Sequence, residues 1–210
     1  MLWLGEGRAK WFAIGATIAI VAVIIVIKEY DNIPLLRDYM AERIKAWLDK
    51  DYEPTGARWQ TNQSLYAIGS GGFFGSGLGN SKEKYLYVSE PQNDFIFAIV
   101  CEELGFVGAT AILILYGALI VRGITIGMHA KDRFGTLLVF GIMMQVGLQV
   151  ALNVAVVTDT LPNTGISLPF FSYGGSSTLV TLGEMGIVLG VSRQANLPKY
   201  SFVSKNTKKK

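Results

Sequence analysis

Hydrophobic and charged positions divide the chain into long apolar segments and short charged connections. Three runs contain no charged side chain, namely residues 11–27, 104–121 and 134–157. An α-helix needs about 20 apolar residues to cross a hydrocarbon core of ~30 Å. With their flanking residues, the runs predict membrane spans at about 11–28, 95–121 and 134–157.

A fourth span is predicted at about 176–192, "SSTLVTLGEMGIVLGVS". This segment is short, rich in Gly and Ser, and interrupted by Glu184. Small residues are common where transmembrane helices pack closely, and an acid inside a span usually faces protein rather than lipid. The sequence therefore predicts an all-α integral membrane protein, with four transmembrane helices in one membrane domain over residues 1–210.

Composition agrees with a membrane location. The chain is 50% hydrophobic and 17% charged, with a mean hydropathy of +0.37, which is too apolar for an ordinary soluble domain. No small-residue cleavage site follows the first run, so we expect it to remain as a span. Cys101 is the only cysteine, which excludes an intrachain disulfide and indicates a small buried side chain. The net charge of +3 comes mainly from the basic tail 193–210, so it gives no indication of nucleic-acid binding.

The distribution of Lys and Arg predicts the topology. Basic residues occur in the N-terminal stub (Arg8 and Lys10), in loop 122–133 and in the tail, whereas loop 158–175 contains none. By the positive-inside rule both termini are cytoplasmic, and loops 29–94 and 158–175 face outward.

The outer loop 29–94 has structure of its own. Its segment "PLLRDYMAERIKAWLDK" places Leu36, Met40, Ile44 and either Trp47 or Leu48 on one face, which predicts an amphipathic helix at the bilayer surface. A short helix is expected in "RWQTNQSLYAI". The glycines of "GSGGFFGSGLGN" predict a tight loop with close backbone approach; a nonspecific turn at the lipid edge is an equal alternative.

Carboxylates gather where the apolar run at 95–121 begins. Glu90 and Asp94 precede it, and Glu102 and Glu103 follow two turns later. Asp94 or Asn93 suits a helix N-cap, and chemistry at the membrane surface is the alternative. At least one of the two later glutamates must point into the bundle, because a carboxylate in lipid costs several kcal/mol.

The span 134–157 carries a polar stripe formed by Gln145, Gln149 and Asn153 on one helix face. Such a stripe, like Glu184 in the last span, either joins helices or lines a wet cavity. The sequence favours the first interpretation and leaves the second open.

The outer loop before the last span, "TDTLPNTGISLPFFSYGGSSTLV", combines prolines, glycines and hydroxyls. Nonhelical backbone near membrane depth requires burial in protein or contact with a cavity. Backbone amides at the start of a helix suit an anionic oxygen such as that of a phosphate. The candidate residues are Ser172, Tyr173, Gly174, Gly175, Ser176 and Ser177, and an ordinary N-terminal turn of a span is the alternative.

Two long motifs, "QSLYAIGSGGFFGSGLGNSKEKYLYVSEPQNDFIFAIVCEELGFVGA" and "PNTGISLPFFSYGGSS", resemble the SEDS family of bacterial cell-wall polymerases. The likeness runs from about residue 8 to 194 and is stronger to the division and sporulation members, FtsW and SpoVE, than to the elongation member, RodA. Family members have about ten spans, and this chain resembles the last four.

The resemblance implies a peptidoglycan glycosyltransferase of the bacterial cytoplasmic membrane that polymerises lipid II at the outer face during division or sporulation. It implies that Asp94 is essential. The family often has His-Thr before this aspartate, whereas this chain has Gln92-Asn93, which puts a role for that histidine in doubt. Its expected partners are lipid II, a class B penicillin-binding protein and other division proteins. We expect the 210 residues alone to be inactive.

A carboxylate at the outer boundary can act as general base for the attacking sugar hydroxyl. The leaving diphosphate needs positive or amide partners, for which Arg58, Lys82, Lys84 and the SYGGSS amides are candidates, with Glu90 in the same substrate-binding group. A divalent cation, Mg²⁺ or Mn²⁺, held by Asp94 and Glu90 is a further option. A transporter of lipid-linked precursors and a noncatalytic scaffold of the division machinery are the alternative functions.

Overall fold

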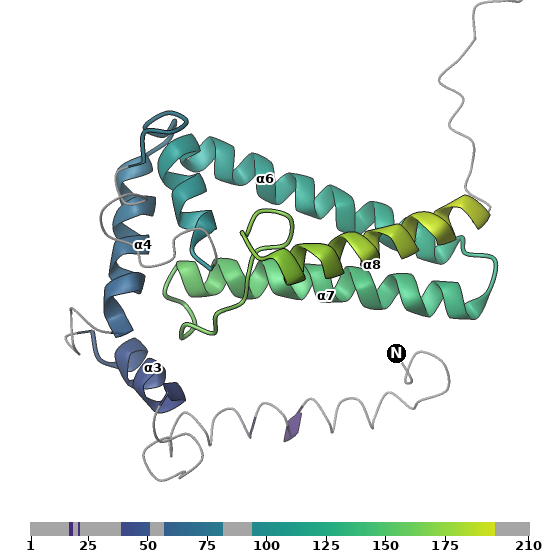
Figure 1. The fold of residues 1–210 in the computed structure, drawn as a ribbon, viewed down its shortest axis with the longest axis horizontal. Coiled ribbons are helices and arrows are strands. Elements are labelled where there is room, and N and C mark those ends of the chain that lie inside the picture. Colours follow the sequence, from purple (N-terminus) through teal and green to yellow (C-terminus); the bar gives the residue numbers. More distant parts are fainter. Residues whose placement is uncertain (1–16, 19–20, 22–38, 51–56, 82–93, 196–210) are drawn as a thin grey trace, which may run out of the picture.

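The computed structural model describes residues 17–18, 21, 39–50, 57–81 and 94–195 (Figure 1). Its five longer helices are α3 (Tyr39–Leu48), α4 (Ala57–Gly71), α6 (Ile96–Met128), α7 (Arg133–Val157) and α8 (Gly175–Gln194). Within these ranges the chain forms helices, turns and loops and no strand, as the sequence predicted. The predicted first span, most of residues 11–28, lies outside the described residues.

Helices α6, α7 and α8 lie side by side, and together they form a bundle (Figure 1). Helices α6 and α7 are long and apolar enough to cross a membrane. Buried side chains from all three helices meet in one cluster, whose members include Ile126, Val139, Met143 and Val188. Helices α3 and α4 lie at one end of this bundle, which we call the α4 end.

Helix α6 is broken at Gly105, where φ is +66° and ψ is −169°. Figure 1 shows the segment before the break beside α4 and steeply inclined to the rest of α6. The predicted span at 95–121 is therefore not one continuous helix. Residues 96–104 form a separate helical segment, and the helix continues past Arg122 to Met128. Arg122 is exposed, and a long cationic side chain near a helix end can reach the polar interface.

The break in α6 is held by the glycine-rich loop 72–80. Backbone amides of Ser76 and Gly77 donate to the carbonyl oxygens of Glu102 (2.9 Å) and Glu103 (3.0 Å). In return, the amide of Phe106 donates to the carbonyl oxygen of Gly72 at 2.9 Å. The loop thus satisfies main-chain groups that the broken helix leaves unpaired.

Close backbone contact explains the glycines at three positions around this break, Gly71, Gly75 and Gly105. A Cβ atom on Gly71 would lie 2.0 Å from the carbonyl oxygen of Cys101, and one on Gly105 would lie 2.3 Å from the amide of Gly75. The tight loop predicted from the glycine density is confirmed. Phe73 and Phe74 of the loop are exposed, which agrees with the alternative of a turn at the lipid edge.

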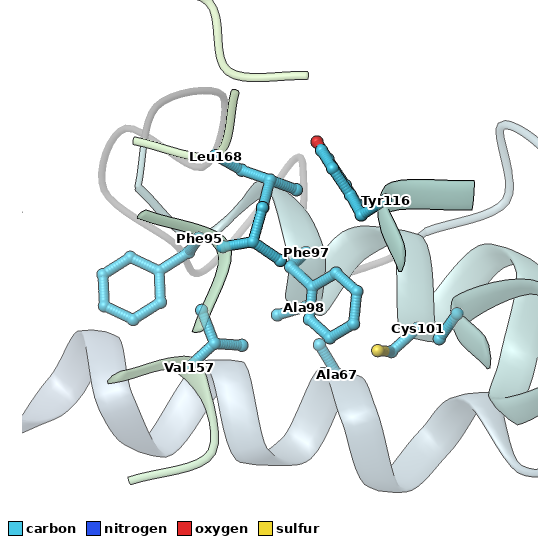
Figure 2. Packing of buried hydrophobic residues seen from close by; sticks show 10 residues of the cluster. Ala67, Phe95, Phe97, Ala98, Cys101, Tyr116, Val157 and Leu168 are labelled. Atoms are coloured by element: carbon cyan, nitrogen blue, oxygen red, sulfur yellow. The ribbon is translucent and has the colours of Figure 1, made fainter. Parts of the chain in front are cut away.

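A second hydrophobic core lies at the α4 end. It packs the short segment of α6 against α4, α7 and the loop that follows α7. Figure 2 shows Phe95 and Phe97 between Leu168, from the loop that follows α7, and Ala67 of α4, with Val157 of α7 beside them. All five side chains are buried. Cys101 belongs to the same cluster and is a free, buried thiol, as expected.

Helix α3 corresponds to the predicted amphipathic helix, and it packs against the rest of the chain through one face. Ile44 is buried, and Trp47 is half-buried and donates from Nε1 to the carbonyl oxygen of Asp159 at 3.1 Å. Leu48 is exposed, so Trp47 is the residue of that pair on the packed face. In this way α3 is fastened to the loop that follows α7.

Candidate functional site

Asp94 lies at the α4 end, immediately before the short segment of α6. Its side chain is half-buried, whereas the next side chain, that of Phe95, is buried in the core. Phe95 is the N-cap residue of α6, and no side-chain hydrogen bond caps this helix. The prediction that Asp94 serves as the N-cap is therefore wrong, and Asn93 lies outside the described residues.

The main chain of Asp94 is held by Asn153 near the end of α7. Asn153 Nδ2 donates to the carbonyl oxygen of Asp94 at 2.8 Å and to that of Ile166 at 2.7 Å. The Asn153 side chain is almost completely buried. One amide group thus joins the segment before α6 to loop 158–174.

The carboxylate of Asp94 faces loop 158–174 and a cation from α3. Asp94 Oδ2 lies 3.4 Å from the position that a Cβ on Gly165 would take, and Arg43 Nη1 lies 3.9 Å from the same point. Gly165 has a φ of +71°, a conformation that glycine adopts without steric cost. The absence of a side chain at Gly165 leaves space beside both charged groups.

Arg43 was missed by the sequence analysis. Its Nη1 donates to the carbonyl oxygen of Asn163 at 2.9 Å, so it also fixes the loop beside Asp94. A signal for it was present, because Arg43 follows Met40 by three residues and precedes Trp47 by four. Residues at these spacings share one helix face, so Arg43 borders the face that packs.

Side chains within loop 158–174 shape its path. Asn163 Oδ1 accepts from the amide of Gly165 at 3.1 Å, and Asn163 Nδ2 donates to Gln60 Oε1 of α4 at 3.4 Å. Further along, Tyr116 of α6 donates to the carbonyl oxygen of Pro169. The loop is therefore bound to α4, α6 and α7 around the site.

The predicted SYGGSS group divides into structural and exposed parts. Ser172 is buried, and its Oγ accepts from the amide of Leu168 at 2.7 Å, so it closes the loop. Tyr173 is exposed. Helix α8 begins at Gly175 with Gly174 as N-cap, and no side chain caps it. The amides of the first turn, at Gly175, Ser176 and Ser177, thus keep the arrangement expected for binding an anionic oxygen.

Arg58 does not have the exposed position expected of a diphosphate ligand. It is buried, its Nη2 pairs with Asp159 Oδ2 at 2.8 Å, and its Nη1 donates to the carbonyl oxygen of Ala46 at 2.6 Å. Asp159 has a φ of +57° and also accepts the hydrogen bond from Trp47. Arg58 therefore serves a structural role, as the cation that fixes the end of α7 to α3 and α4.

This role predicts a stability effect for Asp159→Asn, because the substitution removes the charge opposite a buried guanidinium. Asparagine tolerates positive φ as well as aspartate does, so backbone strain should not contribute. We expect a loss of about 3 kcal/mol, measured as a lower melting temperature of the purified protein in detergent. Asp132→Asn, at an exposed N-cap where both residues are suitable, is the control. Equal melting temperatures would contradict the structural role.

The two glutamates of α6 precede the break at Gly105 and so lie outside the long apolar segment. Glu102 is buried and accepts a hydrogen bond from Ser81 Oγ at 2.5 Å. Glu103 is half-buried, and its Oε1 has no hydrogen-bond partner among the described residues. Glu102 therefore points inward, as required of at least one of them.

Two of the three residues in the polar stripe of α7 make hydrogen bonds to other parts of the chain. Gln145 Nε2 donates to Glu184 Oε1 of α8 at 2.8 Å, and Asn153 makes the contacts to Asp94 and Ile166 described above. Gln149 lies between them and is half-buried. The Gln145 contact supports the helix-joining interpretation, whereas Asn153 binds the backbone of the segment before α6 and of loop 158–174.

Three predicted site residues, Lys82, Lys84 and Glu90, lie outside the described residues. Within the described ranges, no group of three or more His, Cys, Asp or Glu side chains could hold a metal ion. The predicted divalent-cation site used Asp94 together with Glu90, and Glu90 is not among these ranges, so that site stays a prediction.

The fold and the site define a class: a helical membrane protein with a carboxylate held at one end of its bundle, beside a glycine-containing loop and an arginine. A family model described as cell cycle protein FtsW/RodA/SpoVE matches residues 1–197. The chain belongs to this family, as the resemblance indicated.

Curated relatives give the same assignment. Stage V sporulation protein E of Bacillus subtilis is 46% identical over 184 residues, which are 87% of this chain and 50% of the relative. A probable peptidoglycan glycosyltransferase FtsW of Trichlorobacter lovleyi is 46% identical over 154 residues, covering 73% of this chain and 40% of the relative. The chain thus spans half or less of the length of these relatives.

Solved structures share the fold. A chain from a structure described as structural coordination of polymerization and crosslinking by a peptidoglycan synthase complex has a TM-score of 0.67 and 27% identity, covering 91% of this chain and 51% of that chain. A mutant of the rod shape determining protein RodA of Thermus thermophilus has a TM-score of 0.50 and 28% identity, covering 91% and 59%.

Proposed function

We propose that this chain carries the polymerising site of a peptidoglycan glycosyltransferase that acts on lipid II at the outer face of the bacterial cytoplasmic membrane. The observation that carries the proposal is the position of Asp94, a half-buried carboxylate at one end of the bundle with space beside it at Gly165. The names of the FtsW and SpoVE relatives support the activity and its use in division or sporulation.

In the proposed reaction Asp94 is the general base. A sugar hydroxyl of one lipid II attacks the anomeric carbon of another, and its proton passes to the Asp94 carboxylate. The bond from that carbon to the diphosphate oxygen breaks, and the lipid diphosphate leaves with the bonding electron pair. A single displacement of this kind inverts the anomeric configuration.

The charge of the leaving diphosphate needs donors fixed in advance. The first-turn amides of α8 at Gly175, Ser176 and Ser177 are the described candidates, and Lys82 and Lys84 remain proposed ligands. Arg43, whose Nη1 lies near the same point as Asp94 Oδ2, places a positive charge beside the proposed base. This assignment replaces Arg58 by Arg43 as the arginine that serves the site.

A topology with both termini in the cytoplasm places the α4 end at the outer surface. This orientation is part of the proposal and follows from the basic residues at the opposite end, where Lys131 and Arg133 flank the connection between α6 and α7. We propose a class B penicillin-binding protein as the partner that crosslinks the product, in line with the synthase complex among the structural neighbours.

The test uses a full-length relative in which the C-terminal half is replaced by residues 1–197, the range that matches the family. The chimera is purified with its penicillin-binding partner, the transpeptidase is inhibited, and labelled lipid II is supplied. We expect a ladder of glycan strands on a gel, and none from residues 1–197 alone. A folded chimera that moves lipid II across liposomes without polymerising it would favour a transporter, and neither activity would favour a scaffold.

A further inference from the structure

We infer that Asn153 is the positioning residue for Asp94, and this inference rests on the proposed function. The amide nitrogen of Asn153 reaches two carbonyl oxygens at once, those of Asp94 and Ile166, at 2.8 and 2.7 Å. Both partners are acceptors, so they identify the atom facing them as the nitrogen, which has two hydrogens to donate. The orientation of the side chain is thereby determined.

The two acceptors belong to the two backbone segments that border the Asp94 carboxylate. The carbonyl of Asp94 is attached to the Cα atom that carries the side chain, so holding it restricts where the carboxylate points. Ile166 follows Gly165, the residue that the carboxylate faces at 3.4 Å from its Cβ position. One side chain thus sets the separation between the base and the loop beside it.

The surroundings of Asn153 suit a fixed group. Its side chain is 1% exposed, and it projects from the last turns of α7, a long regular helix. Its Oδ1 is buried and has no hydrogen-bond partner within the part of the chain that the structure describes. Burying an amide whose oxygen has no hydrogen-bond partner costs free energy. A residue that only joined helices would not need to carry this cost. Its donated hydrogen bonds to the site account for its presence.

The same helix face supplies a comparison for a purely structural role. Gln145, two turns earlier, also bonds across the bundle, to Glu184 of α8, but it contacts nothing at the site. Gln145 donates one hydrogen bond to a carboxylate and Asn153 donates two to carbonyl oxygens, so the loss of either residue should lower stability. Only the loss of Asn153 should displace the base.

The experiment uses the chimera with its partner and compares Asn153→Leu, Asn153→Asp, Gln145→Leu and Asp94→Asn. Leucine keeps the branched outline of Asn153, in a somewhat larger side chain, and removes both donors; aspartate keeps its shape but has at most one hydrogen to donate, so it cannot bind both carbonyls. We expect both Asn153 variants to lower kcat for lipid II polymerisation roughly 10- to 100-fold, the range associated with a displacement of about 1 Å. KM should change little, and Gln145→Leu should retain kcat. Melting temperatures identify variants that remain folded.

A folded Asn153 variant with unchanged kcat overturns the inference. So does an equal loss of kcat in Gln145→Leu, which would indicate general loosening of the bundle. If Asn153→Leu does not fold, Asn153→Asp, which is closest in size, decides the question. Failure of the proposed function looks different: Asp94→Asn would then keep polymerising. An inactive Asp94→Asn beside a fully active Asn153→Leu disproves the positioning role alone.

Discussion

Replacing Asp94 by asparagine is expected to reduce polymerisation of lipid II about 1,000-fold, within the range that general-base catalysis supplies. Asparagine has nearly the same shape but cannot accept the hydroxyl proton. The hydrogen bond from Asn153 reaches the main-chain carbonyl of residue 94, so it survives the substitution and the local backbone should stay in place. The initial rate of glycan formation by the chimera with its penicillin-binding partner measures the effect.

The control for this substitution is Asp132→Asn at the opposite end of the bundle. Asp132 is exposed and caps α7 by accepting from the amide of Gly135 at 3.3 Å, a role that asparagine fills equally well. Its polymerisation rate should match that of the unsubstituted chimera. Equal product yields from the Asp94→Asn and Asp132→Asn variants would contradict the assignment of the base.

Asp94→Glu separates the charge of the carboxylate from its position. The variant keeps a carboxylate but extends it by one methylene toward Gly165, where Asp94 Oδ2 already lies 3.4 Å from the position that a Cβ would take. We expect a rate between those of the wild-type chimera and Asp94→Asn. A full recovery would indicate that charge alone matters and that the position set by Asn153 does not.

The elements formed by local pattern could be predicted from the sequence. Residues 134–157, an uncharged run with small and apolar side chains, correspond to α7 almost residue for residue. The density of glycines before residue 81 predicted a tight loop, and the loop is tight. The placement of Asp94 at a boundary was visible because the charge pattern changes there.

The break in α6 could not be predicted, because nothing local distinguishes Gly105 from Gly108 or Gly117 in the same run. All three glycines lie in apolar surroundings, and glycine is common inside membrane helices. Gly105 differs only in that the distant loop 72–80 packs against it. The contact that breaks the helix comes from a segment distant in sequence. The uncharged run is a local pattern, so it predicted a span that continued across Gly105.

The prediction that Arg58 binds the diphosphate failed for a related reason. Both arginines stand in helices of the outer loop, and sequence alone does not show which one meets Asp159 and which one approaches Asp94. The structure resolves this through the packing of α3 and α4 on loop 158–174, which buries Arg58 against Asp159 and leaves Arg43 at Asn163. Polar residues acquire their roles from such tertiary contacts.

The tightness of the loop against α6 makes Gly75→Ala a severe substitution. Gly75 has a φ of +78°, and a Cβ there would lie 2.1 Å from the carbonyl oxygen of Glu103 and 2.7 Å from the amide of Gly105. These are backbone atoms that cannot rotate away, and alanine at positive φ adds its own cost. We expect a loss on the order of 4 kcal/mol, seen as a melting temperature roughly 10 °C lower in detergent.

Gly69→Ala is the matched control for Gly75→Ala, since Gly69 lies in α4 with nothing within 4 Å of its Cβ position. Alanine is favoured over glycine inside a helix by about 0.5–1 kcal/mol, so this variant should melt at the same temperature or slightly higher. If Gly75→Ala and Gly69→Ala had the same melting temperature, the loop would not be packed tightly against the break. The short segment that begins after Asp94 would then not be held in place by this loop. Separation of the two melting curves ties the position of the base to backbone contacts made far from it in sequence.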